Sequence, residues 1–218
     1  MRDLLFRCSA IGKLMTEPKT KAEGVLSTGA KTHIRELAAQ EIFGVTFEVS
    51  TRPMQKGIEC EDEAIAMLGR VRGLELVKNT ERRKNEWIMG EADVVTPSRG
   101  YDTKCSWSVA TFPICEADCV DKLYEWQVRG YMWLWDTPAW EVVYALVSTP
   151  EHLAQYELPS MHFVDHIPEA HRITGWTILR DADKESAMIE KIKAARIYYA
   201  EVVAEFDRTH SQSLEIKA

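Results

Sequence analysis

The chain has 218 residues, 45% of them hydrophobic, with 27 lysines and arginines against 34 aspartates and glutamates. This length and composition are typical of one globular domain. The formal net charge of −7 excludes binding of nucleic acid through a basic field over the whole surface, although a local basic patch remains possible. The longest strongly apolar run, residues 142–147, is much shorter than the roughly 20 residues of a membrane-spanning helix. We expect a single domain over residues 1–218, with its core at about 54–150 and no membrane contact.

The cysteines indicate the compartment. There are five, an odd number, and the N-terminal segment carries charges within its apolar stretch, unlike a secretory signal. Both features favour reduced thiols and a cytoplasmic location. The one close pair, Cys115 and Cys119, is interpreted as two thiols on one helical turn rather than as a metal site.

The first half of the chain is predicted to contain helices followed by strands. Ser9 can cap a short turn at 10–12, and a loop follows. Apolar residues at helical spacing predict a helix over 31–43, ending at Gly44, and a second over about 54–72. The pattern then predicts strands over 74–80, 86–96 and 100–108. The turn at 97–100 favours an antiparallel pairing of the last two.

The second half alternates in the same way. A helix is predicted over 119–135, ending near Pro138, and a strand over 141–148 whose continuous apolar run indicates a central position in the sheet. Another strand is expected at 171–180, followed by a C-terminal helix over about 182–207. The predicted fold class is α/β, a mixed central β-sheet flanked by helices.

Chemistry is concentrated in the segment from Gly90 to Cys105. Asp93 lies in one predicted strand, and Asp102 and Lys104 lie in the next. Because alternate strand residues point to the same face, Asp102 and Lys104 project together, and a hairpin can bring Asp93 beside them. Two neighbouring carboxylates repel each other unless a cation lies between them, and hard oxygen ligands suit Mg²⁺ or Mn²⁺. The alternative is a solvated Asp–Lys pair on a surface hairpin.

Two further features make this alternative less attractive. The helix before the strands carries Glu61 in a dense acidic run, where a carboxylate could complete a metal site, although an acidic helix start is also favoured by the helix dipole. The helix after the strands places Gln127 and Tyr131 on one face, where an amide and a phenol can hydrogen-bond a phosphate or the lysine. Tyr131 could equally pack in the core.

These residues resemble a known superfamily, the PD-(D/E)XK nucleases, which have a restriction-endonuclease-like core. Asp93 matches the first acid, Asp102-Thr103-Lys104 matches (D/E)-x-K, and Gln127…Tyr131 resembles the QxxxY element of the RecB-like branch. The run Gly57-x-x-x-Glu61-x-x-Ala64 resembles a helix of the lambda exonuclease and YqaJ-type viral recombinase family. Two positions depart from the pattern, because Ala92 replaces the proline and Asp102 replaces the glutamate usual in this branch. No cysteine follows Cys119, so no iron–sulfur cluster is expected.

The resemblance implies a metal-dependent DNA exonuclease that acts on double-stranded ends, 5′ to 3′, in phage-type recombination. It implies two Mg²⁺ or Mn²⁺ ions held by Glu61, Asp93, Asp102 and the carbonyl of Thr103. Lys104 would position or activate the attacking water, supported by Gln127 and Tyr131. The family further implies a partner, a single-strand annealing recombinase, and a homo-oligomer, most often a trimeric ring around DNA.

Candidate DNA contacts are less specific. Arg7 and Ser9 could bind a terminal 5′-phosphate, although Ser9 serves equally well as a helix cap. Trp107 could stack on a base, although a tryptophan in this position is more often core. Six cations could follow the phosphate backbone or form a solvated turn: Arg70, Arg72, Lys78, Arg82, Arg83 and Lys84.

Two rival functions stay open at this point. The chain could be a non-catalytic nucleic-acid-binding protein on the same fold, although complete motifs argue against it, or an endonuclease with the same core. A nucleotide-dependent small-molecule enzyme is disfavoured because no GxGxxG or P-loop pattern is present.

Overall fold

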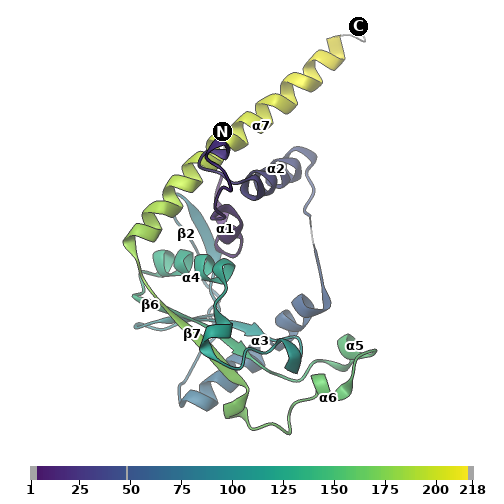
Figure 1. Ribbon diagram of the computed structural model, residues 1–218, viewed down its shortest axis with the longest axis vertical. Coiled ribbons are helices and arrows are strands. Elements are labelled where there is room, and N and C mark those ends of the chain that lie inside the picture. The colour runs from purple at the N-terminus through teal and green to yellow at the C-terminus, as the bar shows by residue number, and fades with distance from the viewer. Residues whose placement is uncertain (1–3, 48, 216–218) are drawn as a thin grey trace.

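Two β-sheets form the centre of the computed structural model, which describes residues 4–47 and 49–215, with side chains to residue 211 (Figure 1). The four-stranded sheet has the order β4 (Val94–Val95), β5 (Gly100–Cys105), β6 (Ala139–Ala145) and β7 (Ile173–Leu179). Its β5–β6 pair is parallel and the outer pairs are antiparallel. The three-stranded sheet has the order β1 (Phe6–Arg7), β3 (Ile88–Glu91) and β2 (Arg82–Lys84). The predicted α/β class with mixed sheets is confirmed.

Five long or site-forming helices surround the sheets: α1 (Cys8–Leu14), α2 (Thr28–Phe43), α3 (Arg52–Arg72), α4 (Lys122–Trp135) and α7 (Ala182–Glu215). Their ends follow local chemistry. The Ser27 hydroxyl accepts a hydrogen bond from Ala30 N at the start of α2, and Thr51 and Asp121 cap α3 and α4 in the same way. Gly44 ends α2 in the left-handed conformation, with a φ of 63°.

Short helices and single 3₁₀ turns complete the connections. They are α5 (Glu151–Ala154), α6 (Pro159–His162) and the 3₁₀ turns Lys21–Glu23, Val109–Thr111, Glu116–Cys119 and Glu169–His171. None of the helices in the described ranges is long and apolar enough to cross a membrane.

The four-stranded sheet lies between α3 on one face and α4 on the other. On β6, Val143 and Ala145 pack with side chains of α3, whereas Trp140 and Val142 belong to the larger core that α4 joins. This alternation follows from the two-residue period of a strand. It directs each side chain of the paired strand β5 toward either α3 or α4.

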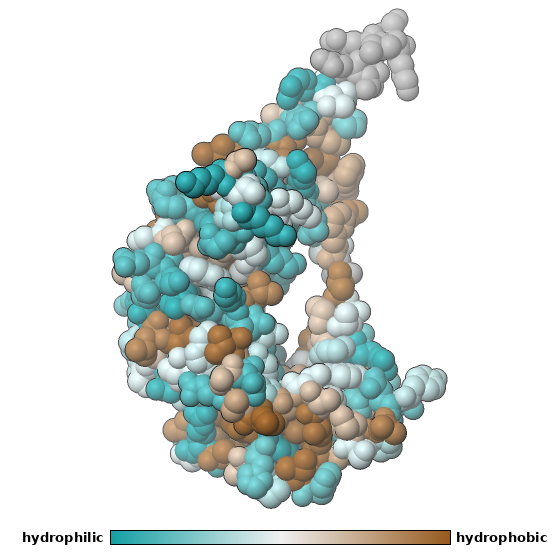
Figure 2. Space-filling view, viewed as in Figure 1, coloured by the Kyte–Doolittle hydropathy of each residue, from teal (hydrophilic) through white to brown (hydrophobic). Residues whose placement is uncertain are grey.

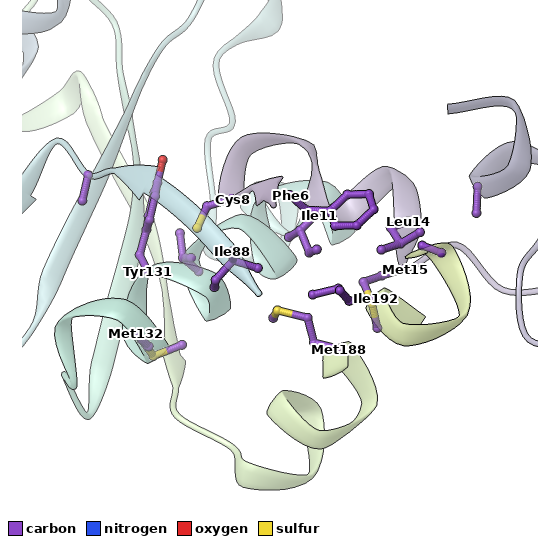
Figure 3. Packing of buried hydrophobic residues seen from close by; sticks show 14 of the residues in the cluster. Phe6, Cys8, Ile11, Leu14, Met15, Ile88, Tyr131, Met132, Met188 and Ile192 are labelled. Atoms are coloured by element: carbon purple, nitrogen blue, oxygen red, sulfur yellow. The ribbon is translucent and has the colours of Figure 1, made fainter. Parts of the chain in front are cut away.

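The larger core joins α1, α4, α7 and the three-stranded sheet. Figure 3 shows Phe6, Ile11 and Ile88 meeting Met188 and Ile192 from α7. The second half of α7 extends beyond this core (Figure 1). Figure 2 shows a hollow between the body and the segment that joins α2 to α3. Phe43, at the end of α2, and Phe47, in the joining segment, expose 62% and 51% of their surface.

Several predicted boundaries were wrong. The strand predicted over 74–80 is absent, since Lys78 makes only an isolated bridge with Val94 and the following strand begins at Arg82. Val77 in this segment is 79% exposed, so its apolar character does not reflect burial. The single strand predicted over 86–96 divides between the two sheets at Ala92 and Asp93.

Other differences concern helix ends. The turn predicted at 10–12 is a full helix, α1, because Ile11 and Leu14 are completely buried in the larger core. The helix predicted from residue 119 begins at Lys122, after a 3₁₀ turn that contains Cys119. The C-terminal helix continues eight residues past the predicted end at Asp207, to Glu215.

Candidate active site

Asp93 lies in the bend between β3 and β4, where the chain passes from one sheet to the other. Its Oδ2 accepts hydrogen bonds from Thr103 N at 2.7 Å and from Thr103 Oγ1 at 2.9 Å. Burial and the nearby charge of Asp102 raise the pKa of the Asp93 carboxyl to about 6. The predicted pairing of the two strand acids is therefore present, and Thr103 is the residue that orients Asp93.

Asp102 and Lys104 project from β5 toward α4, as the strand period predicts. Asp102 is completely buried, and its Oδ1 accepts a hydrogen bond of 3.0 Å from Gln127 Nε2. Lys104 Nζ lies 2.7 Å from Asp102 Oδ2 as an ion pair. Burial lowers the pKa of Lys104, but the carboxylates of Asp102 and Asp93 outweigh this effect and raise it overall, so the ammonium stays charged.

Gln127 connects this pair to the next turn of α4. Its amide nitrogen lies 3.1 Å from Tyr131 Oη as well as 3.0 Å from Asp102. Gln127 and Tyr131 are both buried. The i, i+4 spacing read from the sequence thus produces a hydrogen-bonded chain that ends on the buried carboxylate.

Glu61 approaches from α3. Burial, followed by the charge of Asp93, raises the pKa of its carboxyl, while an ion pair with Lys78 at 3.2 Å opposes that shift. Lys78 also contacts Asp62 at 2.8 Å. Glu61, the predicted third carboxylate, therefore lies near Asp93, and in this structure it forms an ion pair with Lys78.

All of these groups line one cavity of about 620 Å³. Its walls include every predicted catalytic residue: Glu61, Asp93, Asp102, Lys104, Gln127 and Tyr131. Thr103 also lines the cavity, together with Arg7 and Ser9 from β1 and α1. The fold thus joins residues that are up to 124 positions apart in the chain, from Arg7 to Tyr131.

A smaller polar cavity of about 280 Å³ adjoins the first, and six residues line both: Arg7, Ser9, Glu61, Glu91, Asp93 and Tyr131. Three cations line it, Arg7, Lys78 and Arg82, together with the hydroxyl-bearing Ser9. Sequence reasoning selected all four residues for DNA contact but did not predict that they share a wall.

Other predicted DNA contacts lie elsewhere. Arg83 points away from this cavity because strand residues alternate; it pairs with Glu81 and lies over the Trp135 ring, 5.3 Å from its centroid. Lys84 is exposed on the edge strand β2. Trp107 packs edge-on against His162, with ring centroids 5.0 Å apart.

Two further members of the basic segment take part in ion pairs within the fold. Arg70 contacts Glu63 and Glu169, each at 2.7 Å, and Arg72 contacts Glu141 at 2.6 Å. Glu141 is buried on the central strand β6, so Arg72 compensates a charge inside the fold. Neither arginine lines the two cavities.

Sequence reasoning missed one residue of the site, Tyr124, and part of the role of another, Thr103. Thr103 was expected to contribute only its carbonyl, but its N–H and hydroxyl hold Asp93. Tyr124 lines the larger cavity with its ring 4.5 Å from Lys104 Nζ. Its position three residues before Gln127, on the same helical face, was the available signal.

The donor set was tested for metal binding on the geometry of this structure. Among residues 4–47 and 49–211, no group of three or more His, Cys, Asp or Glu side chains is already arranged to hold an ion. Asp102 Oδ2 is nevertheless buried with the Lys104 ammonium 2.7 Å away as its partner, and its neighbour Asp93 is a second hard carboxylate donor on the same cavity. These oxygens fit a divalent cation. The Lys104 ammonium now compensates the charge of Asp102, as Lys78 compensates that of Glu61 on the helix side.

The fold and the sequence were compared with those of known proteins. No family model matches the chain, and no curated protein matches it. Among solved structures, a phage-related exonuclease from Haemophilus somnus 129PT is 37% identical, with a TM-score of 0.87, over 93% of this chain and 96% of that one.

More distant structures share the fold. The alkaline exonuclease LHK-Exo from Laribacter hongkongensis is 15% identical with a TM-score of 0.68, over 97% of this chain and 94% of that one. Its structure in complex with dAMP gives 17% identity and a TM-score of 0.63 over the same shares. The near-complete match to the 37% identical exonuclease, with the motif residues gathered on one cavity, shows that this chain is a nuclease of the lambda exonuclease and YqaJ-type family within the PD-(D/E)XK superfamily.

Proposed function

We propose that the protein is a divalent-metal-dependent exonuclease that hydrolyses phosphodiester bonds at double-stranded DNA ends, 5′ to 3′, in phage-type recombination. The observation that carries the proposal is the convergence of Asp93, Asp102 and Lys104 on one cavity with Glu61 and Gln127. Two acids and a lysine in this order are suited to phosphodiester hydrolysis, in which negative charge grows on the phosphate.

Asp93, Asp102, Glu61 and the Thr103 carbonyl would hold the ions, two Mg²⁺ or Mn²⁺. When bound, these ions would supply positive charge against the attacking and leaving oxygens of the phosphate. The protein's own contribution is to hold the carboxylates: Thr103 orients Asp93 with two hydrogen bonds, and Gln127 orients Asp102 with one. Glu61 would exchange its contact with Lys78 for the ion, leaving Lys78 paired with Asp62.

Lys104 would position the attacking water or the scissile phosphate. Its ammonium remains charged because two carboxylates raise its pKa, and it lies on the cavity wall. A fixed cation in a largely water-excluded site is worth most where negative charge develops during the reaction.

The smaller cavity would select DNA ends. Arg7, Lys78 and Arg82 line a space of about 280 Å³ that adjoins the catalytic cavity. An incoming phosphate would compete for Lys78 and Arg82 with their present ion-pair partners, Glu61 and Glu91. A terminal 5′-phosphate carries more negative charge than an internal phosphodiester, so this cluster favours an end over a continuous strand. Ser9 would add a hydroxyl donor.

The test is digestion of linear duplex DNA labelled at either end, with Mg²⁺ and with chelator. We expect release of label from the 5′ end first, only with the metal, and faster from a 5′-phosphorylated end. Closed circular DNA of the same sequence is the control that separates exonuclease from endonuclease. Cleavage of the circle at the same rate would support the endonuclease alternative, and binding without cleavage of either substrate would contradict an enzymatic function.

Assembly belongs to the same proposal. We propose a homo-oligomer, a trimeric ring, that encloses the duplex and operates with a single-strand annealing recombinase. The support is the family to which the chain belongs and the clustering of cations at one site in a chain of net charge −7.

A further inference from the structure

Lys104 has a second neighbour that the motifs do not include. Its ammonium lies 4.5 Å from the centroid of the Tyr124 ring, a distance typical of a cation–π contact. Both side chains line the catalytic cavity. Lys104 therefore lies between a carboxylate, Asp102, and an aromatic face.

Tyr124 is itself held in place from two sides. On α4, its backbone N–H donates to the capping carboxylate of Asp121 at 3.2 Å. Its ring meets that of Tyr144 edge-on, with centroids 6.3 Å apart and planes at 61°. Tyr144 is the register partner of Lys104 across the β5–β6 pair, and its hydroxyl donates to the carbonyl of Cys119. The Tyr124 ring thus packs against both Lys104 and Tyr144, which are neighbours across the β5–β6 pair.

The two neighbours of Lys104 do different things. The Asp102 carboxylate takes up an N–H of the ammonium, and it is also the oxygen donor that the proposed function assigns to a metal ion. A carboxylate shared with a metal has less negative charge to offer the lysine. An aromatic face attracts the ammonium through its quadrupole, does not bind the metal, and leaves the N–H groups free to reach water or phosphate.

We propose that Tyr124 is a positioning residue for Lys104, and that its ring face, not its hydroxyl, keeps the ammonium aimed into the cavity when Asp102 is engaged by a metal ion. This inference rests on the proposed function, because it assigns to Lys104 the role given there. It adds a tyrosine three residues before Gln127 to the residues on which the rate depends.

The first experiment separates ring from hydroxyl. Initial rates on linear duplex DNA with Mg²⁺ would be measured for wild type, Tyr124→Phe and Tyr124→Leu, with DNA affinity measured separately in Ca²⁺. We expect Tyr124→Phe to keep kcat within about threefold, and Tyr124→Leu to lower kcat about tenfold or more, with KM and Kd within twofold. Tyr156→Leu, at a tyrosine that is 92% exposed and outside the cavity, is the matched control.

The second experiment asks whether the effect passes through Lys104. In a Lys104→Ala background, followed in long single-turnover incubations, Tyr124→Leu should cost nothing further, since the group that it positions is gone. A full additional loss in that background would overturn the proposal. So would a loss in Tyr124→Phe equal to that in Tyr124→Leu, because the hydroxyl would then be the active group.

A third set guards against misfolding of the leucine variant. Phenylalanine analogues with one, two and three ring fluorines at position 124 keep the shape of the ring but progressively weaken its quadrupole. We expect log kcat to fall with each fluorine at constant melting temperature, and a flat series would overturn the proposal. If wild type cleaves no DNA with any divalent ion, the proposed function fails; if wild type is active and all position-124 variants match it, only this inference fails.

Discussion

At the scale of single residues, the site is a set of charges buried close to one another. Asp93 and Asp102 are near enough for the second to raise the pKa of the first to about 6, and Lys104 offsets part of this repulsion at 2.7 Å from Asp102. Such an arrangement costs stability, since each charge has left water. Clusters of buried charges of this kind are found mainly at functional sites, where the charges act on a substrate.

Neutralising Asp93 or Asp102 tests whether these buried charges serve catalysis. Asp93→Asn and Asp102→Asn should each lower the Mg²⁺-dependent cleavage rate by at least about 10²-fold, the order of effect expected when a catalytic electrostatic group is removed. The melting temperature of Asp93→Asn should hold or rise, because a buried repulsion is relieved while the amide oxygen can still accept the two hydrogen bonds from Thr103. Asp102→Asn also loses the ion pair with Lys104, so its melting temperature should fall although the protein still folds. Asp207→Asn, on an exposed carboxylate of α7 outside both cavities, is the matched control and should leave the rate within about twofold. A folded Asp102→Asn protein with a near-normal rate would contradict the assignment.

At the scale of elements, the site depends on how α3 and α4 dock on the two faces of one sheet. Lys56 attaches α3 to the end of β5: its ammonium is completely buried and donates to the carbonyls of Ser106 at 2.6 Å and Trp107 at 3.1 Å. On the other face, α1 and α4 approach closely because Gly12 has no side chain; a Cβ there would lie 2.8 Å from Leu123 Cα. These contacts fix the positions of α3 and α4 on the sheet, and therefore the positions of Glu61 and Gln127 relative to Asp102.

The buried lysine predicts a pH dependence of stability. Burial lowers the pKa of Lys56 to about 8, from an ordinary value of 10.5. Between these two values the unfolded chain binds more protons than the folded chain, so the contribution of Lys56 to the free energy of unfolding increases as the pH rises. The difference between wild type and Lys56→Met in urea unfolding should therefore grow in favour of wild type by on the order of 2 kcal/mol between pH 7.5 and 10. Because Lys56 also lowers the pKa values of the Cys60 and Cys105 thiols, both proteins would carry Cys60→Ala and Cys105→Ala. Parallel pH curves in that background would contradict the prediction.

The helix contact predicts opposite effects of the same substitution at two glycines. Gly12→Ala should lower the free energy of unfolding by about 1–3 kcal/mol, because the added methyl group meets the backbone of Leu123. Gly57→Ala, in the interior of α3 with open space where a Cβ would be, should raise it by about 0.5–1 kcal/mol. Urea denaturation of both variants checks the pair. If Gly12→Ala is as stable as wild type, α1 and α4 do not pack as closely as described.

At the scale of the whole molecule, positive charge is unevenly spread over an acidic protein. Arg7, Lys78 and Arg82 gather at the smaller cavity, where Lys78 pairs with Glu61 and Arg82 with Glu91. Arg70 and Arg72 are engaged by carboxylates elsewhere. A duplex about 20 Å wide cannot be enclosed by one chain of 24.9 kDa. Enclosure by several chains would let weak, salt-sensitive contacts retain a moving substrate.

Two measurements, the mass of the oligomer and the salt dependence of processivity, test whether several chains enclose the duplex. Light scattering should report a mass well above 24.9 kDa, close to three times that value for a trimer. Neutralising Arg82, Arg83 and Lys84 together should lower processivity at every salt concentration and make it depend less steeply on salt, because fewer phosphate contacts release fewer counterions. The single-turnover rate should change little. Neutralising three exposed cations of α7, Lys184, Lys193 and Arg208, is the matched control. A monomer that degrades long duplexes without dissociating would contradict the ring.

The sequence was sufficient to predict the features that depend on the local spacing of residues. The helical periods of α2, α3 and α7, the buried strand β6 and the antiparallel β4–β5 pair all follow from local spacing. The strand period also placed Asp102 and Lys104 on one face, and the helix period placed Gln127 beside Tyr131. Local spacing determines these relations because they depend only on backbone geometry within one or two neighbouring elements.

Tertiary structure decided the rest. Whether Val77 is buried depends on what packs against its side chain. Here the segment touches β4 only through the bridge between Lys78 and Val94, and Val77 stays exposed, so an apolar segment was mistaken for a strand. Asp93 could be placed only once the chain was seen to change sheets, and Thr103 and Tyr124 only once β5 was covered by α3 on one face and by α4 on the other. Sequence spacing carries no information about which surfaces meet across long separations in the chain. The packing of the core determines which helix and strand surfaces contact each other, and therefore which residues contact Lys104 and Glu61.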